Sequence, residues 1–239
     1  MSTFNDLLSR HIASSLLKQQ SLSRFLGEHN WSVSLSDGVV DFGKGRVYPI
    51  QIIGTESELN GTWLWAWANT ESPIPAPLLR CAGQLRSLGE NEGIEELTQA
   101  ELELDRVDGH MLAMVACGVC NADAYYRGPY EGGAAFFLMH QTPLQEPPPS
   151  SSTEMINLMA SVISQFPVNH RLMAQAFLQQ QGYKLVESED RIVASSAAGS
   201  EITITFEAAG RISGMETTAT PGPATSATAS KKPRWRFGR

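Results

Sequence analysis

The segment TWLWAWAN, at positions 62–69, constrains the fold more than any other part of this sequence. In an extended strand, neighbouring side chains point to opposite faces of the sheet. Trp63, Trp65 and Trp67 therefore share one face, and the other face carries one leucine and two small alanines. Each indole buries roughly 150 to 250 Å² of surface when it packs in a core. The alternation predicts a central strand that is buried on both faces and leaves space for a helix beside the alanines.

The same three indoles also have a functional interpretation. Aligned aromatic rings offer stacking and cation–π surfaces to a base, a sugar or a cationic group. Asn69, at the end of the strand, is placed to orient a ligand, although asparagine at such a position is more typical of a turn. Aromatic residues that alternate in a strand usually pack in a core. We favour the structural interpretation and keep Trp63, Trp65, Trp67 and Asn69 as candidate ligand-binding residues.

The sequence before this strand has the pattern of a helix followed by antiparallel strands. Apolar residues recur at helical spacing over residues 3–26, and Gly27 ends the pattern. Two alternating segments then flank Asp37-Gly38, a pair that favours tight hairpin turns. With the strands at residues 47–54 and 62–69, these segments predict a four-stranded antiparallel meander.

The sequence after the strand predicts two helices and a second hairpin. Leucine and alanine recur at helical spacing over residues 78–90, and Asp108 is suited to cap a helix that runs to about residue 122. The segments AYYRGPY and GGAAFFLMH have the pattern of two strands around a turn that contains Gly128-Pro129. Residues 90–107 fit neither pattern clearly.

A proline- and serine-rich segment at residues 142–152 predicts a semi-rigid linker between two units. Residues 1–141 then form an α+β domain with the tryptophan strand at its centre. Residues 153–216 form a second, smaller α+β domain of two helices and a small sheet. Residues 217–239 are rich in threonine, alanine and serine and end in KKPRWRFGR, which predicts a disordered basic tail. The predicted fold class is α+β, with an antiparallel sheet and packed helices in the first unit.

Motifs that carry chemistry are weak or missing. Cys117 and Cys120 form a single CxxC motif at the end of a predicted helix, whereas a thioredoxin-type pair opens one. The five histidines lack metal-ligand spacing, and no GxSxG marks a nucleophile. A Ser/His/Asp set that assembles only in space stays open. We expect three free thiols, no metal and no cofactor, and the sequence favours a protein that is not an enzyme.

The charge distribution limits the partners. The formal net charge is −7, although the last nine residues carry five basic groups and no acid. An acidic body argues against a general nucleic-acid surface, which needs Lys and Arg to replace phosphate counterions, and leaves the tail as the exception. The acidic segment at residues 90–108 includes Glu95 and Glu96, which are candidates for contact with a basic partner, although a solvated surface is the more common role of such a segment. The sequence has no membrane-spanning stretch and no signal peptide at its start, so we expect a cytoplasmic protein.

The residues from Gly54 to Asn69, with the YPIQIIG that precedes them, resemble an uncharacterised bacterial family whose hallmark is this tryptophan strand. The similarity extends over about residues 5 to 140. It implies a bacterial source, and because the family is a domain of unknown function it supplies no catalytic residues.

These observations favour a non-enzymatic protein-binding module, with a bacterial immunity-type antitoxin as its most concrete form. In that interpretation the acidic first domain occludes the basic active site of a toxin. The alternative is an enzyme or a small-ligand sensor that uses a pocket beside the tryptophan strand. A third hypothesis is a structural adaptor with two domains and a basic tail.

Overall fold

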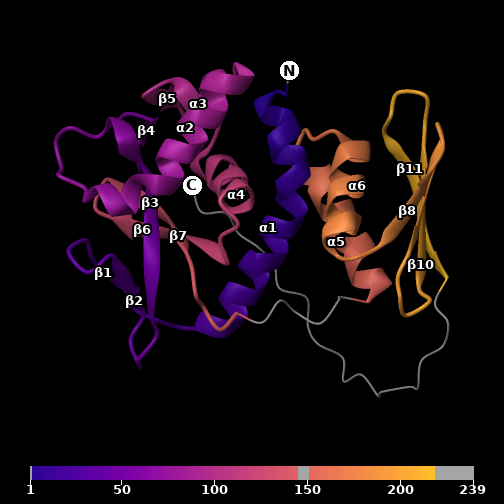
Figure 1. Ribbon diagram of the computed structural model, residues 1–239, viewed down its shortest axis with the longest axis horizontal. Coiled ribbons are helices and arrows are strands. Elements are labelled where there is room, and N and C mark those ends of the chain that lie inside the picture. The colour runs from indigo at the N-terminus through magenta and orange to yellow at the C-terminus, as the bar shows by residue number, and fades with distance from the viewer. Residues whose placement is uncertain (1, 145–150, 219–239) are drawn as a thin grey trace.

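The computed structural model describes residues 2–144 and 151–218. The protein has the predicted α+β fold, in which helices pack against antiparallel sheets. Helix α1 (Phe4–Leu26) lies between a larger sheet and a smaller one (Figure 1). A capping box at Thr3 and Asp6 begins this helix: the backbone N–H of Asp6 donates to the Thr3 hydroxyl over 3.1 Å, and the N–H of Thr3 donates to the Asp6 carboxylate over 2.9 Å.

The larger sheet contains seven antiparallel strands within the described residues. Strand β3 is at its centre and pairs with β2, β4 and β7. The succession from β1 to β4 confirms the predicted meander. The strands are β1 (Ser32–Ser34), β2 (Val39–Asp41), β3 (Val47–Ser57), β4 (Thr62–Trp65), β5 (Glu101–Glu103), β6 (Ala124–Tyr130) and β7 (Gly133–Met139).

The tryptophan strand β4 is shorter than the alternation predicts. Its pairing with β3 ends where Trp65 faces Gly54, and Ala66–Ala68 continue as a 3₁₀ turn, η1. The period of two therefore stops at Trp65, and Trp67 leaves the face that the first two tryptophans share. Ala66 is buried in one cluster with Leu78 and Ala82, so a helix does pack beside this alanine as predicted.

The second hairpin turns at a different place from the predicted one. Gly128 and Pro129 lie within β6, where they pair with Ala135 and Ala134. The chain reverses at Glu131-Gly132, and Gly132 has a φ of 85°, which favours glycine. Pro129 is tolerated in the ladder because β6 is an edge strand, which pairs with β7 alone among the described strands.

Helices that come between the strands in the sequence pack against the larger sheet. Helix α4 begins as predicted at Asp108, whose carboxylate accepts a hydrogen bond of 2.7 Å from the backbone N–H of Met111. The acidic segment that fits no clear pattern forms the end of one helix, a short second helix and strand β5. The helices that cover the larger sheet are η2 (Ala76–Leu79), α2 (Arg80–Glu92), α3 (Glu95–Thr98) and α4 (Gly109–Val119).

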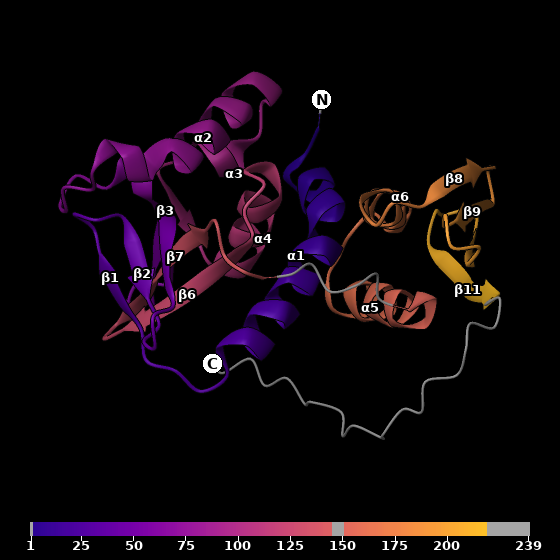
Figure 2. The ribbon, with the colours of Figure 1, turned by 60° about the horizontal axis from the view of Figure 1, so that its bottom comes forward.

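The second unit stacks two helices on the smaller sheet. Helices α5 and α6 lie between α1 and this sheet in both views (Figures 1 and 2). The sheet is an antiparallel meander, β8 to β11, whose buried face is built from alternating residues such as Ile192, Ile204 and Phe206. Its elements are α5 (Ser152–Gln165), α6 (His170–Gln180), β8 (Lys184–Glu187), β9 (Arg191–Ser195), β10 (Glu201–Phe206) and β11 (Ile212–Thr218).

One hydrophobic core runs through both units. Leu8 and Ile12 of α1 belong to the same buried cluster as Met159 and Phe177 of the second unit. The division at residues 142–152 stays a prediction, although α5 begins at Ser152, inside the expected linker. Thr217 and Thr218 end β11, and the rest of the expected disordered tail lies outside the described residues.

Candidate functional site

The first two tryptophans of β4 are buried side by side. Trp63 and Trp65 have 0% exposure, and their rings meet edge to face with centres 5.5 Å apart. The Trp63 ring also meets Phe136 at 5.2 Å. The Trp65 Nε1 donates a hydrogen bond of 3.0 Å to the backbone carbonyl of Glu96. In this conformation neither ring has surface for a ligand, and a ligand-binding role for them stays a prediction.

Trp67 and Asn69 lie at the surface end of the same segment. Trp67 is half-buried, and the Arg86 guanidinium lies over its ring, with Cζ 4.5 Å from the ring centre. The Asn69 side-chain oxygen accepts hydrogen bonds of 3.0 Å from the backbone N–H groups of Glu71 and Ser72. Asn69 thus stabilises a turn, which is the role the sequence favours, and Trp67 anchors an arginine of α2.

Glu95 and Glu96 open helix α3 and share one cation. Arg106 lies 2.5 Å from a Glu95 oxygen and 3.7 Å from a Glu96 oxygen. They belong to a wider acidic surface, formed by the end of α2, α3, β5 and the loop before α4, which lie together in Figure 1. We define the acidic surface as Glu90, Glu92, Glu95, Glu96, Glu101, Glu103, Asp105 and Asp108.

The acidic surface concentrates the charge of the protein. Residues 90–108 carry eight acids and one base, so their formal charge equals the −7 of the whole chain. Apart from Glu92 and Glu96, these acidic residues are exposed. The structure thus connects the tryptophan strand with Glu96 through the Trp65 hydrogen bond, while Asn69 does not contact the two candidate glutamates in any described interaction.

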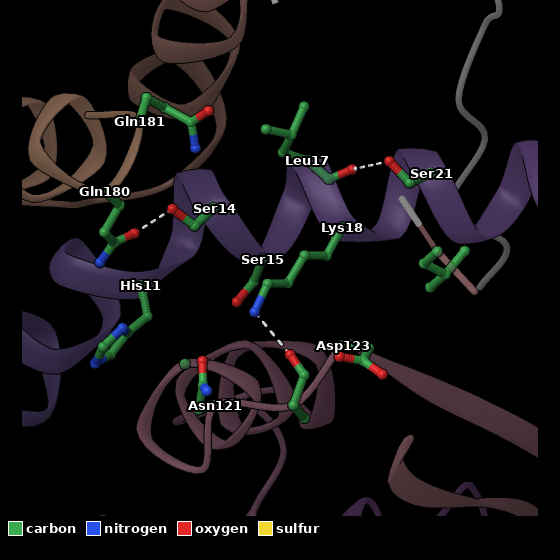
Figure 3. A pocket seen from close by; sticks show the side chains of 13 residues that line it. His11, Ser14, Ser15, Leu17, Lys18, Ser21, Asn121, Asp123, Gln180 and Gln181 are labelled. Carbon is green, nitrogen blue, oxygen red and sulfur yellow. Dashed lines mark hydrogen bonds between the residues drawn. The ribbon is translucent and has the colours of Figure 1, made fainter. Parts of the chain in front are cut away.

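A polar cavity of about 430 Å³ lies between α1, the loop after α4, and α6 (Figure 3). Ser14 points toward Gln180 of α6, and Ser15 and Lys18 point toward the loop that carries Asn121. The Lys18 ammonium donates a hydrogen bond of 2.7 Å to the backbone carbonyl of Ala122. The polar groups of this cavity thereby fasten α1 to its neighbours on both sides.

The polar cavity brings a histidine, three serines and an aspartate together without forming a catalytic triad. Ser15 donates to the Met114 carbonyl over 2.9 Å, and Asp123 accepts from both the N–H and the hydroxyl of Thr142. Burial, with Arg10 and Lys18 nearby, lowers the pKa of His11 to about 4, which makes it a weak base. Among the described residues no hydrogen bond links His11 to a serine, so the geometry does not activate a nucleophile.

A second cavity, of about 330 Å³, lies between α1, β6 and α5, and we call it the amphipathic cavity. Its apolar wall consists of Leu16, Leu22, Leu26, Leu158 and Phe166. Its polar lining includes His29, His110, Tyr125, Tyr126 and Arg127, together with glutamines and serines of α1 and α5. Sequence analysis missed both cavities because each is assembled from three or more segments that carry no motif.

The three cysteines are free thiols, as expected, and two of them are neighbours. The Cys120 thiol lies 3.8 Å from the backbone oxygen of Cys81. A hydrogen bond from the Cys120 thiol, aided by His140, lowers the pKa of the Cys81 thiol, whereas burial raises the pKa of Cys117 to about 11. The acidic thiol is therefore Cys81, which pairs with the second cysteine of the CxxC motif and lies outside that motif.

Two further findings concern the described part of the chain. No group of three or more His, Cys, Asp or Glu side chains there is placed to hold a metal ion. None of the helices described is both long enough and apolar enough to cross a membrane.

Comparison with known proteins places the first unit in a family. Residues 5–142 match the model of a family described as a family of unknown function, DUF6882. This confirms the resemblance expected over about residues 5 to 140. No curated protein and no solved structure matches the chain significantly. The second unit, which closes both cavities with α5 and α6, lies outside the matched range.

Proposed function

The chain belongs to the DUF6882 family of unknown function through residues 5–142, and from its charge distribution we propose that it is a non-enzymatic protein-binding module. The acidic surface carries this proposal: a segment of 19 residues holds a formal charge equal to that of the whole chain. A concentrated field of one sign attracts a partner of opposite charge and speeds its association. The partner is therefore a basic protein.

The scaffold beneath the acidic surface supports this function. The backbone of Glu96 is held by the buried Trp65, and Glu95 is held by Arg106. Arg86 rests on Trp67 and pairs with Glu90 at 2.9 Å. Groups that are ordered before binding lose less conformational entropy when a partner arrives. The tryptophan strand then supports the binding surface, and the glutamates make the direct contacts with the partner.

The most concrete form of this proposal is a cytoplasmic bacterial protein of the immunity type. An antitoxin of this kind covers the basic active site of a toxin with carboxylates. It needs exposed acids on a stable support, and it needs no catalytic groups of its own.

Charge neutralisation tests the proposal. The variant Glu101→Gln/Glu103→Gln/Asp105→Asn removes three exposed charges from the acidic surface, and Glu187→Gln/Glu189→Gln/Glu216→Gln removes three from the second unit as a matched control. Calorimetry with the basic product of an adjacent gene should show affinity weakened about a hundredfold by the first variant, near 1 kcal/mol per charge, and little changed by the second. Equal losses, or no complex with any such product, would contradict the proposal.

A small-ligand sensor is the second candidate, and the two cavities beside α1 favour it. From the sequence alone, this hypothesis places the pocket beside the strand face of Trp63, Trp65 and Trp67. A screen of nucleotides, sugars and metal ions by tryptophan fluorescence tests the sensor, because binding of such a ligand changes its emission or its unfolding temperature, whereas the acidic surface of a protein-binding module gives these ligands no such site.

A further inference from the structure

The amphipathic cavity resembles a small-molecule binding site in its volume and in its lining. Ligand sites are concave, mostly apolar, and carry a few polar groups that fix orientation. Its volume of about 330 Å³ lies at the lower end of their usual range, roughly 300 to 1,000 Å³. Leucines from α1 and α5 supply apolar lining, and two tyrosines of β6 and two histidines are among the polar residues that line the same cavity.

Arg127, the arginine that lines the cavity, already pairs with two carboxylates beside it. Arg127 donates to Glu56 over 2.6 Å through Nε and lies 3.1 Å from Glu58 through Nη2. Glu56 is 9% exposed, so its carboxylate is enclosed by the protein, whereas Glu58 is exposed. The guanidinium is therefore neutralised by two carboxylates, and an added anion would meet net negative charge.

Two of the remaining polar groups, His110 and Tyr125, are uncharged near neutral pH. Burial lowers the pKa of His110 and raises the pKa of Tyr125, so both side chains stay neutral. The Tyr125 hydroxyl lies 3.0 Å from His110 Nδ1, and the Tyr126 hydroxyl lies 3.0 Å from His29 Nε2. A phenol hydroxyl is both a donor and an acceptor, so each keeps capacity for a second hydrogen bond.

We propose that the amphipathic cavity binds an uncharged, largely apolar small molecule, with a hydrogen-bonding group of that molecule bonded to the hydroxyl of Tyr125 or Tyr126. The apolar part lies against Leu22, Leu26 and Leu158, where it removes hydrocarbon surface from water. The paired carboxylates beside Arg127 exclude anions. This site is separate from the acidic surface and does not depend on protein binding there.

The second unit completes this site. Leu158, Ser161 and Phe166 come from α5 and its end, whereas the tyrosines come from β6 of the family domain. A bound molecule therefore contacts both units. Its binding stabilises their association because it favours the state in which α5 is packed on α1.

Two related dyes test the proposal on the full-length protein. N-phenyl-1-naphthylamine is uncharged, and 8-anilinonaphthalene-1-sulfonate has the same ring system with a sulfonate. In about 0.5 M salt, which screens the long-range charge of the protein, we expect saturable one-to-one fluorescence with the uncharged dye and at least about tenfold weaker binding of the sulfonate. Equal affinity for the two dyes, or binding without saturation, would overturn the proposal.

A matched pair of variants locates the bound dye. Ser161→Phe fills the cavity from α5, whereas Ser164→Phe places the same ring on an exposed position of the same helix, outside the lining. We expect the first to weaken binding at least about tenfold, a loss near 1.4 kcal/mol, and the second to change it less than about twofold. Ser23→Phe, at an exposed lining position of α1, repeats the block if Ser161→Phe does not fold. Binding that both blocking variants leave intact refutes the site.

Deletion of residues 219–239 tests whether the amphipathic cavity binds a small molecule or the C-terminal segment of the chain itself. The deleted segment contains Trp235 and Phe237, two aromatic residues that an apolar cavity can accept. Unchanged dye affinity supports a small-molecule site. Affinity that rises on deletion identifies the tail as the occupant and overturns the proposal.

Discussion

The indole nitrogen of the buried Trp65 donates a hydrogen bond of 3.0 Å to the backbone carbonyl of Glu96. This contact is one of several that connect the hydrophobic core to the acidic segment, whose Leu97 and Leu102 are themselves buried in that core. Because Trp65 has no exposure and Glu96 opens helix α3, the position of that helix depends on the indole. The tryptophan strand thus helps to position the acidic surface by holding the backbone of Glu96.

We predict that Trp65→Phe destabilises the protein more than Trp63→Phe does. Both changes remove a similar volume from the core, but among the described residues the Trp63 Nε1 has no hydrogen-bond partner. The difference should be about 1 to 2 kcal/mol, the cost of leaving the Glu96 carbonyl without its donor. Urea unfolding of both variants measures it. Equal losses would show that the hydrogen bond contributes nothing beyond ring packing.

Gly54→Ala should strongly destabilise the sheet. A Cβ atom at Gly54 would lie 2.3 Å from Trp63 Cζ2 and 2.7 Å from the Leu64 carbonyl, so a buried ring or the backbone must shift. We expect a loss of about 3 kcal/mol or an unfolded chain. Gly83→Ala is the control, because its Cβ meets nothing within 4 Å in helix α2 and should stabilise by up to about 1 kcal/mol. Thermal unfolding distinguishes the two, and a stable Gly54→Ala variant would contradict this account of the strand.

Local patterns predicted most elements of the fold. The Asp108 cap, the meander of β1 to β4 and the two helices of the second unit all follow from capping residues, turn residues and apolar spacing. The length of β4 could not be predicted in this way, because it is set by tertiary pairing: with β3, where the ladder ends at Gly54, and with β5, which is distant in the sequence. The turn at Glu131-Gly132 was misplaced because Gly128-Pro129 is the stronger local turn signal, although both residues pair with β7.

The candidate site was predictable only in part. Glu95 and Glu96 were recognised because charge is visible in the sequence, but their link to Trp65 arises from tertiary packing. The amphipathic cavity has no local signature, since Leu16 and Leu158 are far apart in the sequence and become neighbours only when α5 packs near α1. Sequence patterns describe the faces of single helices and strands, whereas a cavity is lined by several of them and therefore has no pattern of its own.

The three cysteines should react with iodoacetamide at different rates. Cys81 has a lowered pKa because Cys120 and His140 stabilise its thiolate, whereas burial raises the pKa of Cys117 to about 11. Because the thiolate is the nucleophile, the native protein at pH 7 should be alkylated within the Cys81 and Cys120 pair well before Cys117. Peptide mass spectrometry over time measures the order. Cys117→Ser should leave the fast phase unchanged, and a fast phase that disappears in this variant would contradict the assignment.

His11 should make the protein less stable in acid. Its pKa falls from 6.5 to about 4 on folding, mainly because of burial. Between these values the unfolded chain binds more protons than the folded one, so the free energy of unfolding decreases as the pH falls from 6.5 toward 4. The loss is on the order of 2 to 3 kcal/mol. His11→Gln cannot take up the proton, so urea unfolding at pH 7 and pH 4.5 should show a smaller decrease for the variant. Identical decreases would mean that His11 titrates normally in the folded state.

Arg127 and Glu56 form the ion pair that keeps charge out of the amphipathic cavity, and a double-mutant cycle tests it. Arg127→Met should cost about 2 to 3 kcal/mol, because Glu56 is 9% exposed and would keep a buried charge without its partner. Adding Glu56→Gln removes that charge and should recover a large part of the loss, which gives a coupling free energy of about 1 to 2 kcal/mol. Urea unfolding of the four proteins provides the cycle. Additive losses would show that the two side chains do not interact, and the exclusion of anions from the cavity would then need another cause.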